Sequence, residues 1–356
     1  MHKKLRSWVL MVCVFVVMGS TMAIYSQDET ESNWCVDVWY PSSEEPTGFE
    51  SITNNAELIH TVNPFWYSPH IDGTVYTNDP NAESEEQLAE MRDLGLTIMP
   101  AIFSSVHSMI MDAETRTFHV NEIVSLVERM DYDGIDIDYE GFPRDTREPF
   151  SLFIEELSDA LHERGYLLSI AVHAKTTDEG AWDAAYAQDW ARIVPAVDMF
   201  RIMTYDYSNR NEPPGPIAPV AWVMDVLTYA ETITDLSHVS MGLHFYGYSW
   251  LRGTPPATTI SWASAQRYIT SFEPDLERNP DDMELFVDLR VTGLPRQTVY
   301  LADAVGLAFK LDLIQEAFPA LGGVSIWGIG GEDPENWDVL GDFITGDCPL
   351  EISTSE

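Results

Sequence analysis

The order of β-rich runs and amphipathic stretches along the chain is the feature that most restricts its fold. Stretches with helical periodicity, such as 84–94, 120–130, 147–164 and 221–232, separate short runs of β-branched and aromatic residues. The predicted strands are 36–40, 58–66, 97–103, 134–139, 166–172, 199–204, 239–245 and 324–327. This alternation predicts an α/β fold, a (β/α)8 TIM barrel. A doubly wound open sheet has similar local patterns, but its Gly-rich phosphate-binding turn is missing from this sequence.

One connection in this pattern is too long for an ordinary loop. Residues 251–295 are rich in proline and acidic side chains, and we expect them to form a small insertion between strand 7 and strand 8, near the active face. The remaining boundaries follow from composition. We expect an acidic N-terminal segment at 27–34, the catalytic barrel at 35–348 and a flexible tail at 349–356.

The N-terminal residues have the pattern of an export signal. His2, Lys3, Lys4 and Arg6 precede an apolar run at 8–18, and small residues follow at 19–23. A membrane anchor is the alternative, but the uninterrupted run is shorter than the roughly 20 residues of a spanning helix. We therefore expect a signal peptide at 1–26, a secreted or cell-envelope protein, and no stable membrane insertion once the signal is removed.

The net charge excludes several partners. Lys and Arg number 19 and Asp and Glu 58, which gives a formal charge of −39. Because no acid occurs before Asp28, loss of the three Lys and Arg of the leader leaves 16 cations against 58 anions, a net of −42. Such a surface repels nucleic acids and anionic membranes.

Two of the three cysteines lie near the ends of the predicted barrel. Outside the cell, a disulfide between Cys35 and Cys348 would close a very long loop and stabilise the fold. Two unrelated buried thiols are the alternative, and we favour the disulfide.

The strongest chemical signal is a run of acids at 136–140. Because side chains alternate along a strand, Asp136, Asp138 and Glu140 share one face, and apolar residues occupy the other. In a barrel the acidic face points into the lumen, where three crowded carboxyl groups cannot all be ionised at low cost. At least one pKa is then raised, as a general acid requires. Glu140 is the candidate, because barrel enzymes carry their chemistry at the C-terminal ends of the strands.

Two other interpretations of the acidic run were weighed. A carboxylate cluster can bind a divalent metal, although no histidine lies at ligand spacing from this one. A solvated edge strand is disfavoured, because the intervening residues are apolar and a helix follows. We expect acid–base chemistry without a metal or another cofactor.

Residues 133–140 read Asp-Gly-Ile-Asp-Ile-Asp-Tyr-Glu, which matches the signature Asp-x-x-Asp-x-Asp-x-Glu. Further along the chain, 203–207 read Met-Thr-Tyr-Asp-Tyr, 241–250 begin Met-Gly-Leu-His, and 323–327 end in tryptophan. In this order the four stretches resemble the fourth, sixth, seventh and eighth strand motifs of glycoside hydrolase family 18, the chitinase family. Within the first motif, the resemblance implies that Asp133 and Gly134 support the site structurally.

Three shorter stretches narrow the resemblance to one branch of the family. Residues 174–177, 214–219 and 333–337 are similar to the branch that contains bacterial spore-cortex and germination hydrolases, over about 35–340 of this chain. Members of that branch are associated with peptidoglycan. The sequence departs from the branch at 300–303, where Tyr-Leu-Ala-Asp stands in place of a Phe-Glu-Asp run.

The resemblance implies substrate-assisted retaining hydrolysis. Glu140 would protonate the glycosidic oxygen while the 2-acetamido carbonyl of the sugar attacks the anomeric carbon. Asp138 would orient the acetamide and stabilise the oxazolinium ion, and Asp136 would share a proton with Asp138. Asp138 and Glu140 lie on one strand about 7 Å apart by strand rise, so neither faces the other as a nucleophile across the bond.

The other motifs imply the sugar-binding residues. Tyr205 is expected to donate a hydrogen bond to the acetamido oxygen, and Trp327 to stack beneath the sugar ring. Asp206 is expected to bind the sugar or to tune nearby groups, Met203 to support the site beside it, and Tyr246 to line the cleft.

These observations predict a glycosidase that cuts β-1,4-linked polymers containing N-acetylglucosamine, either peptidoglycan or chitin. A non-catalytic, lectin-like protein on the same barrel is the alternative, and the presence of Glu140 argues against it. The expected partner is a polysaccharide containing N-acetylhexosamine, and the expected state is a monomer.

Overall fold

The computed structural model describes residues 33–41, 47–79, 81–290, 292–293, 295–344, 346 and 348. The predicted signal peptide and C-terminal tail lie outside these residues, as does most of the predicted acidic segment. Trp34, which belongs to that segment, is only 2% exposed and packs in the main hydrophobic core. The ordered barrel therefore includes at least this last residue of the predicted acidic segment.

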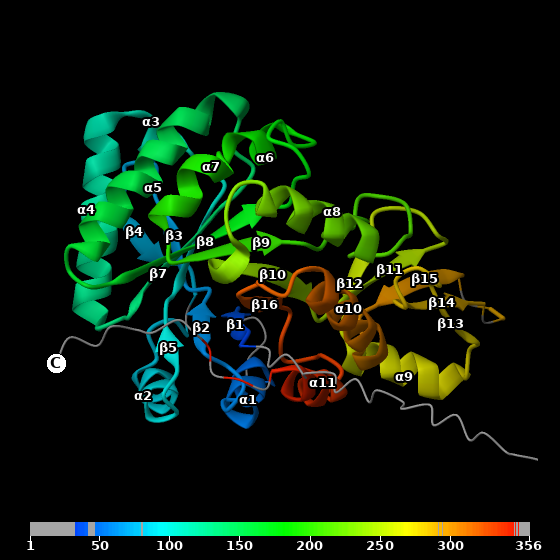
Figure 1. Ribbon diagram of the computed structural model, residues 1–356. Helices are drawn as coiled ribbons and strands as arrows, with labels where there is room; N and C mark the ends of the chain where they lie inside the picture. Colours follow the sequence, from blue (N-terminus) through cyan, green and yellow to red (C-terminus); the bar gives the residue numbers. More distant parts are fainter. Residues whose placement is uncertain are drawn as a thin grey trace, which may run out of the picture. The chain divides into compact units, whose positions relative to one another are not determined.

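The predicted barrel is confirmed: parallel strands form a curled sheet with helices on its outside (Figure 1), and buried side chains such as Asp136 and Arg201 fill its interior. Its strands are β1 (Cys35–Tyr40), β2 (Thr61–Pro64), β5 (Thr97–Ile98), β6 (Ala101–Ser104), β7 (Gly134–Tyr139), β8 (Leu167–His173), β9 (Met199–Met203), β10 (Val239–His244) and β16 (Gly323–Trp327). The order of neighbours is β6, β7, β8, β9, β10, β16, β1, β2 and β5. The alternation of strands and helices, together with the missing Gly-rich turn of a doubly wound sheet, thus predicts this architecture correctly.

The third predicted strand is interrupted where the ring closes. β5 pairs with β2, and β6 pairs with β7. The two residues between β5 and β6 complete the seam, because Met99 N donates to Val62 O at 3.0 Å and Asp136 N donates to Pro100 O at 3.0 Å. Pro100 has no N–H to offer a ladder, which accounts for the break in the strand at this point.

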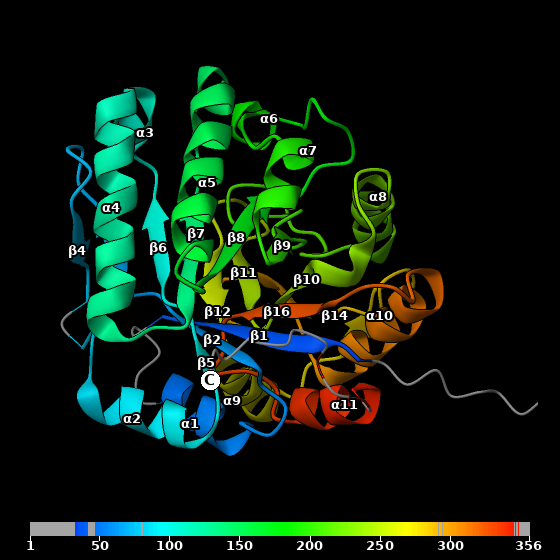
Figure 2. The ribbon, with the colours of Figure 1, turned by 60° about the vertical axis from the view of Figure 1, so that its left-hand side comes forward.

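Helices cover the outside of the barrel, and α4 and α5 lie side by side in Figure 2. The helix predicted at 120–130 begins earlier, because Asp112 caps it by accepting a hydrogen bond from Thr115 N. The α-helices of the barrel are α1 (Thr47–Asn54), α2 (Glu85–Asp93), α3 (Ser108–Met111), α4 (Ala113–Met130), α5 (Arg147–His162), α6 (Asp183–Ala187), α7 (Trp190–Ile193), α8 (Val220–Glu231), α10 (Ala304–Ala317) and α11 (Glu335–Phe343). Short 3-10 turns occupy Arg144–Thr146, Val194–Ala196 and Leu236–His238, and the hairpin of β3 (Tyr67–Pro69) and β4 (Val75–Thr77) extends the sheet at β6.

A second, antiparallel sheet lies between β10 and α10 in the chain, beside the barrel in Figure 1. It consists of β11 (Gly247–Leu251), β12 (Thr258–Ile260), β13 (Leu276–Arg278), β14 (Leu285–Leu289) and β15 (Gln297–Leu301), with helix α9 (Trp262–Phe272). Its bounds differ from the predicted 251–295, because β11 and β15 pair from Gly247 with Leu301 to Leu251 with Gln297. The sheet has a small hydrophobic core of its own, which includes Val287 and Val299.

A disulfide joins the two ends of the barrel. Cys35, the first residue of β1, is bonded to Cys348, which follows α11, and their Cα atoms are 4.8 Å apart. None of the described helices is long and apolar enough to cross a membrane.

Candidate active site

Strand β7 carries the acidic residues up through the lumen. Asp136 is fully buried, Asp138 is 6% exposed, and the side chain of Glu140, just beyond the strand, is 34% exposed. The alternate residues Ile137 and Tyr139 are buried in the main core on the other face. The alternation predicted from the sequence therefore holds, and exposure of the acids increases toward the C-terminal end of the barrel.

Asp136 forms the base of the site and is fully occupied by donors. Its Oδ1 accepts hydrogen bonds from Ser169 Oγ at 2.6 Å and Arg201 Nη1 at 2.8 Å, and its Oδ2 accepts from Trp39 Nε1 at 2.8 Å. Arg201 is also fully buried and contacts Asp37 through Nε at 3.2 Å. Two carboxylates thus share one guanidinium in a buried ionic network, in which both oxygens of Asp136 are hydrogen-bonded and Asp37 Oδ1 lacks a partner among the described residues.

Asp138 lies above this network in a different environment. On the neighbouring strand β6 its register partner is Phe103, whereas the smaller Ala101 is paired with Asp136. Burial raises the pKa of Asp138 well above its ordinary value, and the charges of Glu140 and Asp136 raise it further. Its Oδ1 is buried and has no hydrogen-bond partner among the described residues. Its hydrogen-bonding capacity is therefore available to a ligand.

No hydrogen bond joins Asp138 to Asp136 within the described part of the chain, so the proton sharing expected between them stays a prediction. Both oxygens of Asp136 are directed to other donors, the strongest of which is the guanidinium of Arg201. The effect of Asp136 on Asp138 is electrostatic in this geometry, because its negative charge raises the pKa of Asp138.

Glu140 stands at the mouth of the lumen. Its backbone N–H donates to Ser104 O at 2.8 Å, which fixes the chain where β7 ends. Burial and, next, the negative charge of Asp206 raise the pKa of Glu140 to about 7. A carboxyl group with this pKa exchanges its proton near neutral pH, as an acid–base catalyst must.

Tyr205 and Asp206 follow β9, which is separated from β7 by β8. Burial and, next, the charges of Asp138 and Glu140 raise the pKa of Tyr205 well above its ordinary value. Tyr205 approaches the lumen closely: a Cβ atom added to Gly242 would lie 2.9 Å from its ring. Asp206 adopts a left-handed backbone conformation with φ of 60°. Its Oδ1 accepts hydrogen bonds from Tyr246 Oη at 2.6 Å and Tyr248 Oη at 2.9 Å. These two tyrosines hold the Asp206 carboxylate in place, and its negative charge raises the pKa of Glu140.

Trp327 ends β16 and forms part of the wall of the site. It is half-buried, packs edge-on against Phe65 with ring centroids 5.3 Å apart, and shares with Met203 a contact to the cluster containing Ala101 and Ala171. Trp39 belongs to the same cluster and donates a hydrogen bond to Asp136, so Trp327 and Met203 pack in a cluster that contacts the buried acid. Their roles in sugar binding stay predictions.

Asp133 and Gly134 lie at the other end of β7, away from these groups. Asp133 Oδ2 accepts a hydrogen bond from Ile98 N at 2.7 Å. A Cβ atom added to Gly134 would lie 2.2 Å from Leu167 O, so only glycine permits this pairing of β7 with β8. Both residues set the position of β7 and do not reach the site.

Several residues of the site are absent from the sequence-based prediction. Arg201, Trp39 and Ser169 bind Asp136, Tyr248 binds Asp206, and His173 Nδ1 lies 3.7 Å from Glu140 Oε2. Two features of the sequence could have identified these residues. Strand 199–203 contains one charged residue among apolar ones, and strands 35–40 and 167–173 contain polar residues on one face. These signals identify lumen residues without indicating which of them meet.

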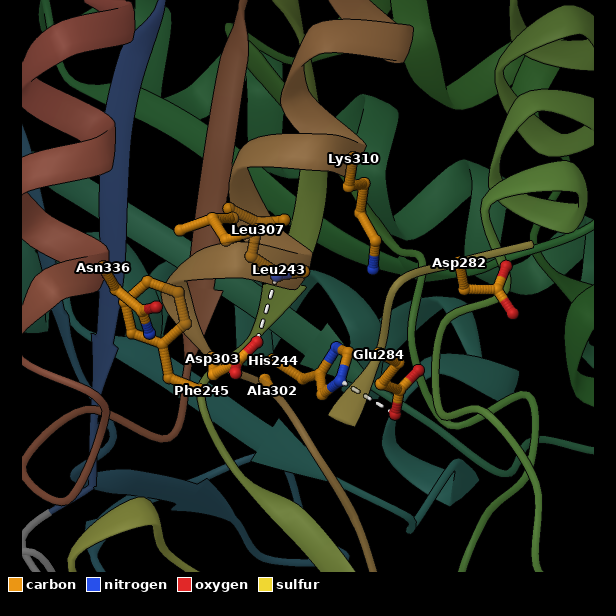
Figure 3. Close-up of a pocket in the computed structure, with 11 residues that line it drawn as sticks. Leu243, His244, Phe245, Asp282, Glu284, Ala302, Asp303, Leu307, Lys310 and Asn336 are labelled. Carbon is orange, nitrogen blue, oxygen red and sulfur yellow. Dashed lines mark hydrogen bonds and ion pairs between the residues drawn. The ribbon is translucent and has the colours of Figure 1, made fainter. Parts of the chain in front are cut away.

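A second cluster of buried charges lies between β10, β14 and α10 (Figure 3). In this view Lys310 extends toward His244 and Glu284, and His244 Nε2 is 3.8 Å from Glu284 Oε1. The cavity that they line has a volume of about 20 Å3, room for one water molecule. Neither nitrogen of His244 and neither polar side-chain atom of Asn336 has a hydrogen-bond partner among the described residues. The cavity therefore has polar groups suited to an ordered water.

Acids of this cluster also accept hydrogen bonds from the backbone of the segment that follows Asp206. Glu284 accepts hydrogen bonds from Ile217 N at 3.0 and 3.1 Å, and Asp282 accepts one from Val220 N at 2.7 Å. Val220 begins α8, so Asp282 caps that helix from a distant part of the sequence. The second sheet thus anchors the connection between β9 and α8.

Metal binding has no candidate ligand set here: within the described ranges, no group of three or more histidine, cysteine, aspartate or glutamate side chains could hold a metal ion. A parallel barrel with graded acids at one strand end, a tryptophan wall and a tyrosine beside the acids defines the class of barrel glycoside hydrolases.

Comparison with known proteins gives the family directly. Residues 38–332 match the model of the glycosyl hydrolases family 18, and the chain belongs to this family. The cortical fragment-lytic enzyme of Bacillus anthracis is 27% identical over 316 residues, which cover 82% of this chain and 70% of that enzyme. The enzyme of the same name from Bacillus subtilis is 30% identical over 229 residues, 63% of this chain and 52% of that enzyme. This chain thus spans about half the length of the Bacillus subtilis relatives that it matches.

Solved structures show the same fold. A chitinase from Chromobacterium violaceum superposes with a TM-score of 0.80 at 23% identity, covering 88% of this chain and 99% of that one. The spore cortex-lytic enzyme SleL of Bacillus cereus superposes with a TM-score of 0.79 at 22% identity, covering 88% of this chain and 75% of that one.

Proposed function

We propose that this protein hydrolyses β-1,4-linked polymers containing N-acetylglucosamine by substrate-assisted retaining catalysis, with Glu140 as the general acid and base. The observation that carries the proposal is the contrast between neighbouring acids on one strand. Asp136 is neutralised by Arg201, Asp138 is buried with an oxygen that lacks a partner, and Glu140 titrates near neutral pH at the mouth of the lumen.

In the first step the protonated Glu140 donates its proton to the glycosidic oxygen as the bond to the anomeric carbon breaks. The carbonyl oxygen of the 2-acetamido group forms the new bond to that carbon, which gives an oxazolinium ion and releases the leaving saccharide with a free hydroxyl group. Asp138 accepts a hydrogen bond from the acetamido N–H and offsets the positive charge of the ion. Tyr205, whose ring lies beside Gly242, donates to the acetamido oxygen.

In the second step water attacks the anomeric carbon and the ionised Glu140 accepts a proton from it. The bond to the acetamido oxygen breaks, the acetamide is restored, and Glu140 is protonated for the next cycle. No second carboxylate is needed across the sugar, which agrees with acids that lie in one row on one strand. Trp327 supports the sugar ring through its broad aromatic face.

The names of the relatives support this substrate class. Cortical fragment-lytic enzymes and chitinases are both similar to this chain. Cortex fragments come from peptidoglycan, and chitin is a polymer of N-acetylglucosamine, so both substrates carry the acetamido group that the mechanism requires. The disulfide between Cys35 and Cys348 agrees with a protein exported to an oxidising compartment.

The proposal is tested with Glu140→Gln and Asp138→Asn, assayed on a fluorogenic chitobioside, colloidal chitin and purified peptidoglycan. We expect both variants to fold and turnover to fall by at least about a thousandfold, because the acid or its acetamide partner is lost. Glu163→Gln, which removes an exposed charge after α5 at the opposite end of the barrel, is the matched control and should keep full activity.

Two results would overturn the proposal. Near-normal activity of Glu140→Gln would remove the acid assignment. Hydrolysis of a glucan without acetamido groups at a comparable rate would show that the substrate does not supply the nucleophile.

A further inference from the structure

His173 lies beside Glu140 and has no part in the mechanism described so far. It is the last residue of β8, and alternation along the strand from Ser169 and Ala171 directs it into the same lumen as the acids. Its Nδ1 is 3.7 Å from Glu140 Oε2. A shift of about 0.7 Å in the partly exposed Glu140 side chain would bring these atoms to hydrogen-bond distance. Such bonds are often long in unliganded enzymes and shorten during turnover.

The second observation is an unpartnered atom. His173 is 7% exposed, and its Nε2 has no hydrogen-bond partner among the described residues. A hydrogen on Nε2 would therefore be buried without an acceptor, whereas a hydrogen on Nδ1 points toward Glu140. The surroundings thus favour the tautomer that can donate to the Glu140 carboxylate.

The third observation is a hydrogen-bonded bridge between the end of β8, which carries His173, and the end of β7, which precedes Glu140. Gln188 accepts a hydrogen bond from His173 N at 2.7 Å through Oε1 and donates one to Tyr139 O at 3.2 Å through Nε2. One buried amide thus bridges the residue that bears the imidazole and the residue just before Glu140. This bridge sets the distance between the imidazole and the carboxyl group without using either side chain.

Trp182 covers the imidazole on its outer side. The two rings lie 4.5 Å apart between centroids, while Trp182 itself is 52% exposed. Burial lowers the pKa of His173 to about 4, so the imidazole is neutral at the pH at which Glu140 exchanges its proton. A neutral donor can stabilise the Glu140 carboxylate without competing for its proton.

We propose that His173 is a positioning residue for Glu140, holding the ionised carboxyl group by a hydrogen bond from Nδ1 between the two steps of catalysis. The proposal rests on the proposed function of Glu140. After Glu140 has given its proton to the leaving sugar, Nδ1–H donates to the carboxylate and keeps its own proton. The carboxylate is then held in place to accept a proton from the attacking water.

The sign of the effect follows from the groups that face Glu140. The negative charge of Asp206 raises the pKa of Glu140, whereas a hydrogen bond from His173 to the ionised form opposes that rise. Loss of the donor should therefore raise the pKa of Glu140. The other titratable groups near these two side chains are Asp136 and Asp138 on β7 and Tyr205 after β9, and the residue opposite His173 on β9 is the uncharged Met203.

The test uses two amide variants of similar size and polarity. In His173→Asn the amide nitrogen takes the place of Nδ1, and in His173→Gln it takes the place of Nε2, which faces away from Glu140. We expect His173→Gln to lower kcat by about tenfold and to move the basic limb of kcat/KM up by about one pH unit. His173→Asn should stay close to the parent protein in both measurements. His162→Gln is the matched control, because His162 Nε2 pairs with Asp198 at 2.9 Å at the far end of the barrel.

A titration independent of turnover completes the test. With 13C-labelled glutamate side chains and Glu140→Gln to assign the signal, NMR should show the Glu140 pKa raised in His173→Gln and unchanged in His173→Asn. Equal profiles and equal titrations of the two amide variants would overturn the positioning role. Because the NMR titration needs no substrate, it decides this inference even if the chain fails to cut any glycan, a result that would refute the proposed function instead.

Discussion

Replacing Asp206 by asparagine tests the electrostatic origin of the acid at the mouth of the site. Asparagine keeps the oxygen that accepts hydrogen bonds from Tyr246 and Tyr248, and it tolerates the left-handed backbone of this position. The substitution therefore removes a charge and leaves the local shape in place.

The expected magnitude follows from the two causes of the raised pKa. The pKa of Glu140 rises from its ordinary value of 4.5 to about 7, and burial accounts for the larger part of this difference. The charge of Asp206 accounts for the smaller part, so its removal should lower the pKa by about one unit. Because a general acid is active only when protonated, the basic limb of kcat/KM should move down by the same amount. Activity at pH 7, relative to the acidic plateau, should fall about fivefold.

The assay is the pH dependence of kcat/KM on a soluble chitobioside between pH 4 and 9, for the parent protein and the variant. Glu163→Gln, after α5 at the opposite end of the barrel, is the control for loss of a surface charge, and its profile should match that of the parent. A lost sugar contact would lower the whole profile without moving its limb. A basic limb that stays in place or moves to higher pH would refute the assignment of Asp206 as the charge that sustains the acid.

Two further predictions concern stability. Arg201→Met should lower the free energy of unfolding by about 3–5 kcal/mol, because it leaves two buried carboxylates without their shared cation. Adding Asp136→Asn should recover part of this loss in urea titrations, and an unchanged unfolding midpoint in the single variant would contradict the ion-pair assignment. Cys348→Ser should lower the free energy of unfolding by about 2–5 kcal/mol, because the bond to Cys35 spans 313 residues. Equal thermal midpoints with and without the bond would contradict this expectation.

The parts of the molecule that were predictable depend on local periodicity. The acids of β7 were assigned to one face because side chains alternate every second residue, and this rule needs no knowledge of distant contacts. The helices at 147–164 and 221–232 were located for the same reason, within one or two residues of α5 and α8. Alternation of the two periods narrowed the fold to a barrel or a doubly wound sheet, and the missing Gly-rich turn favoured the barrel.

The parts that were not predictable depend on how distant strands meet. Asp37 and Arg201 are separated by 164 residues, and only the closed ring brings them together above the floor of the lumen. The same guanidinium also binds Asp136, and the sequence pattern around any one of these three residues does not predict this contact. Trp34 is a second example of a contact that the local sequence does not predict. The polar residues before it predicted a loose segment, but Trp34 is buried in the core.

The second sheet illustrates a third limit. Its pairing of β11 with β15 joins residues about 50 positions apart, so the sequence located a long connection without its strands. The carboxylates of Asp282 and Glu284, which hold the segment after Asp206, come from this connection. Long-range register, rather than composition, decides which acids are structural and which are free to act.

The covalent bond between Cys35 and Cys348 has a consequence for any polypeptide attached to this barrel. Both cysteines sit where β1 starts, at the pole opposite Glu140, with Cα atoms 4.8 Å apart. A tether or an appended module joined before Cys35 and another joined after Cys348 would leave from one shared point. Additions of either kind would therefore begin at the end of the barrel farthest from Glu140.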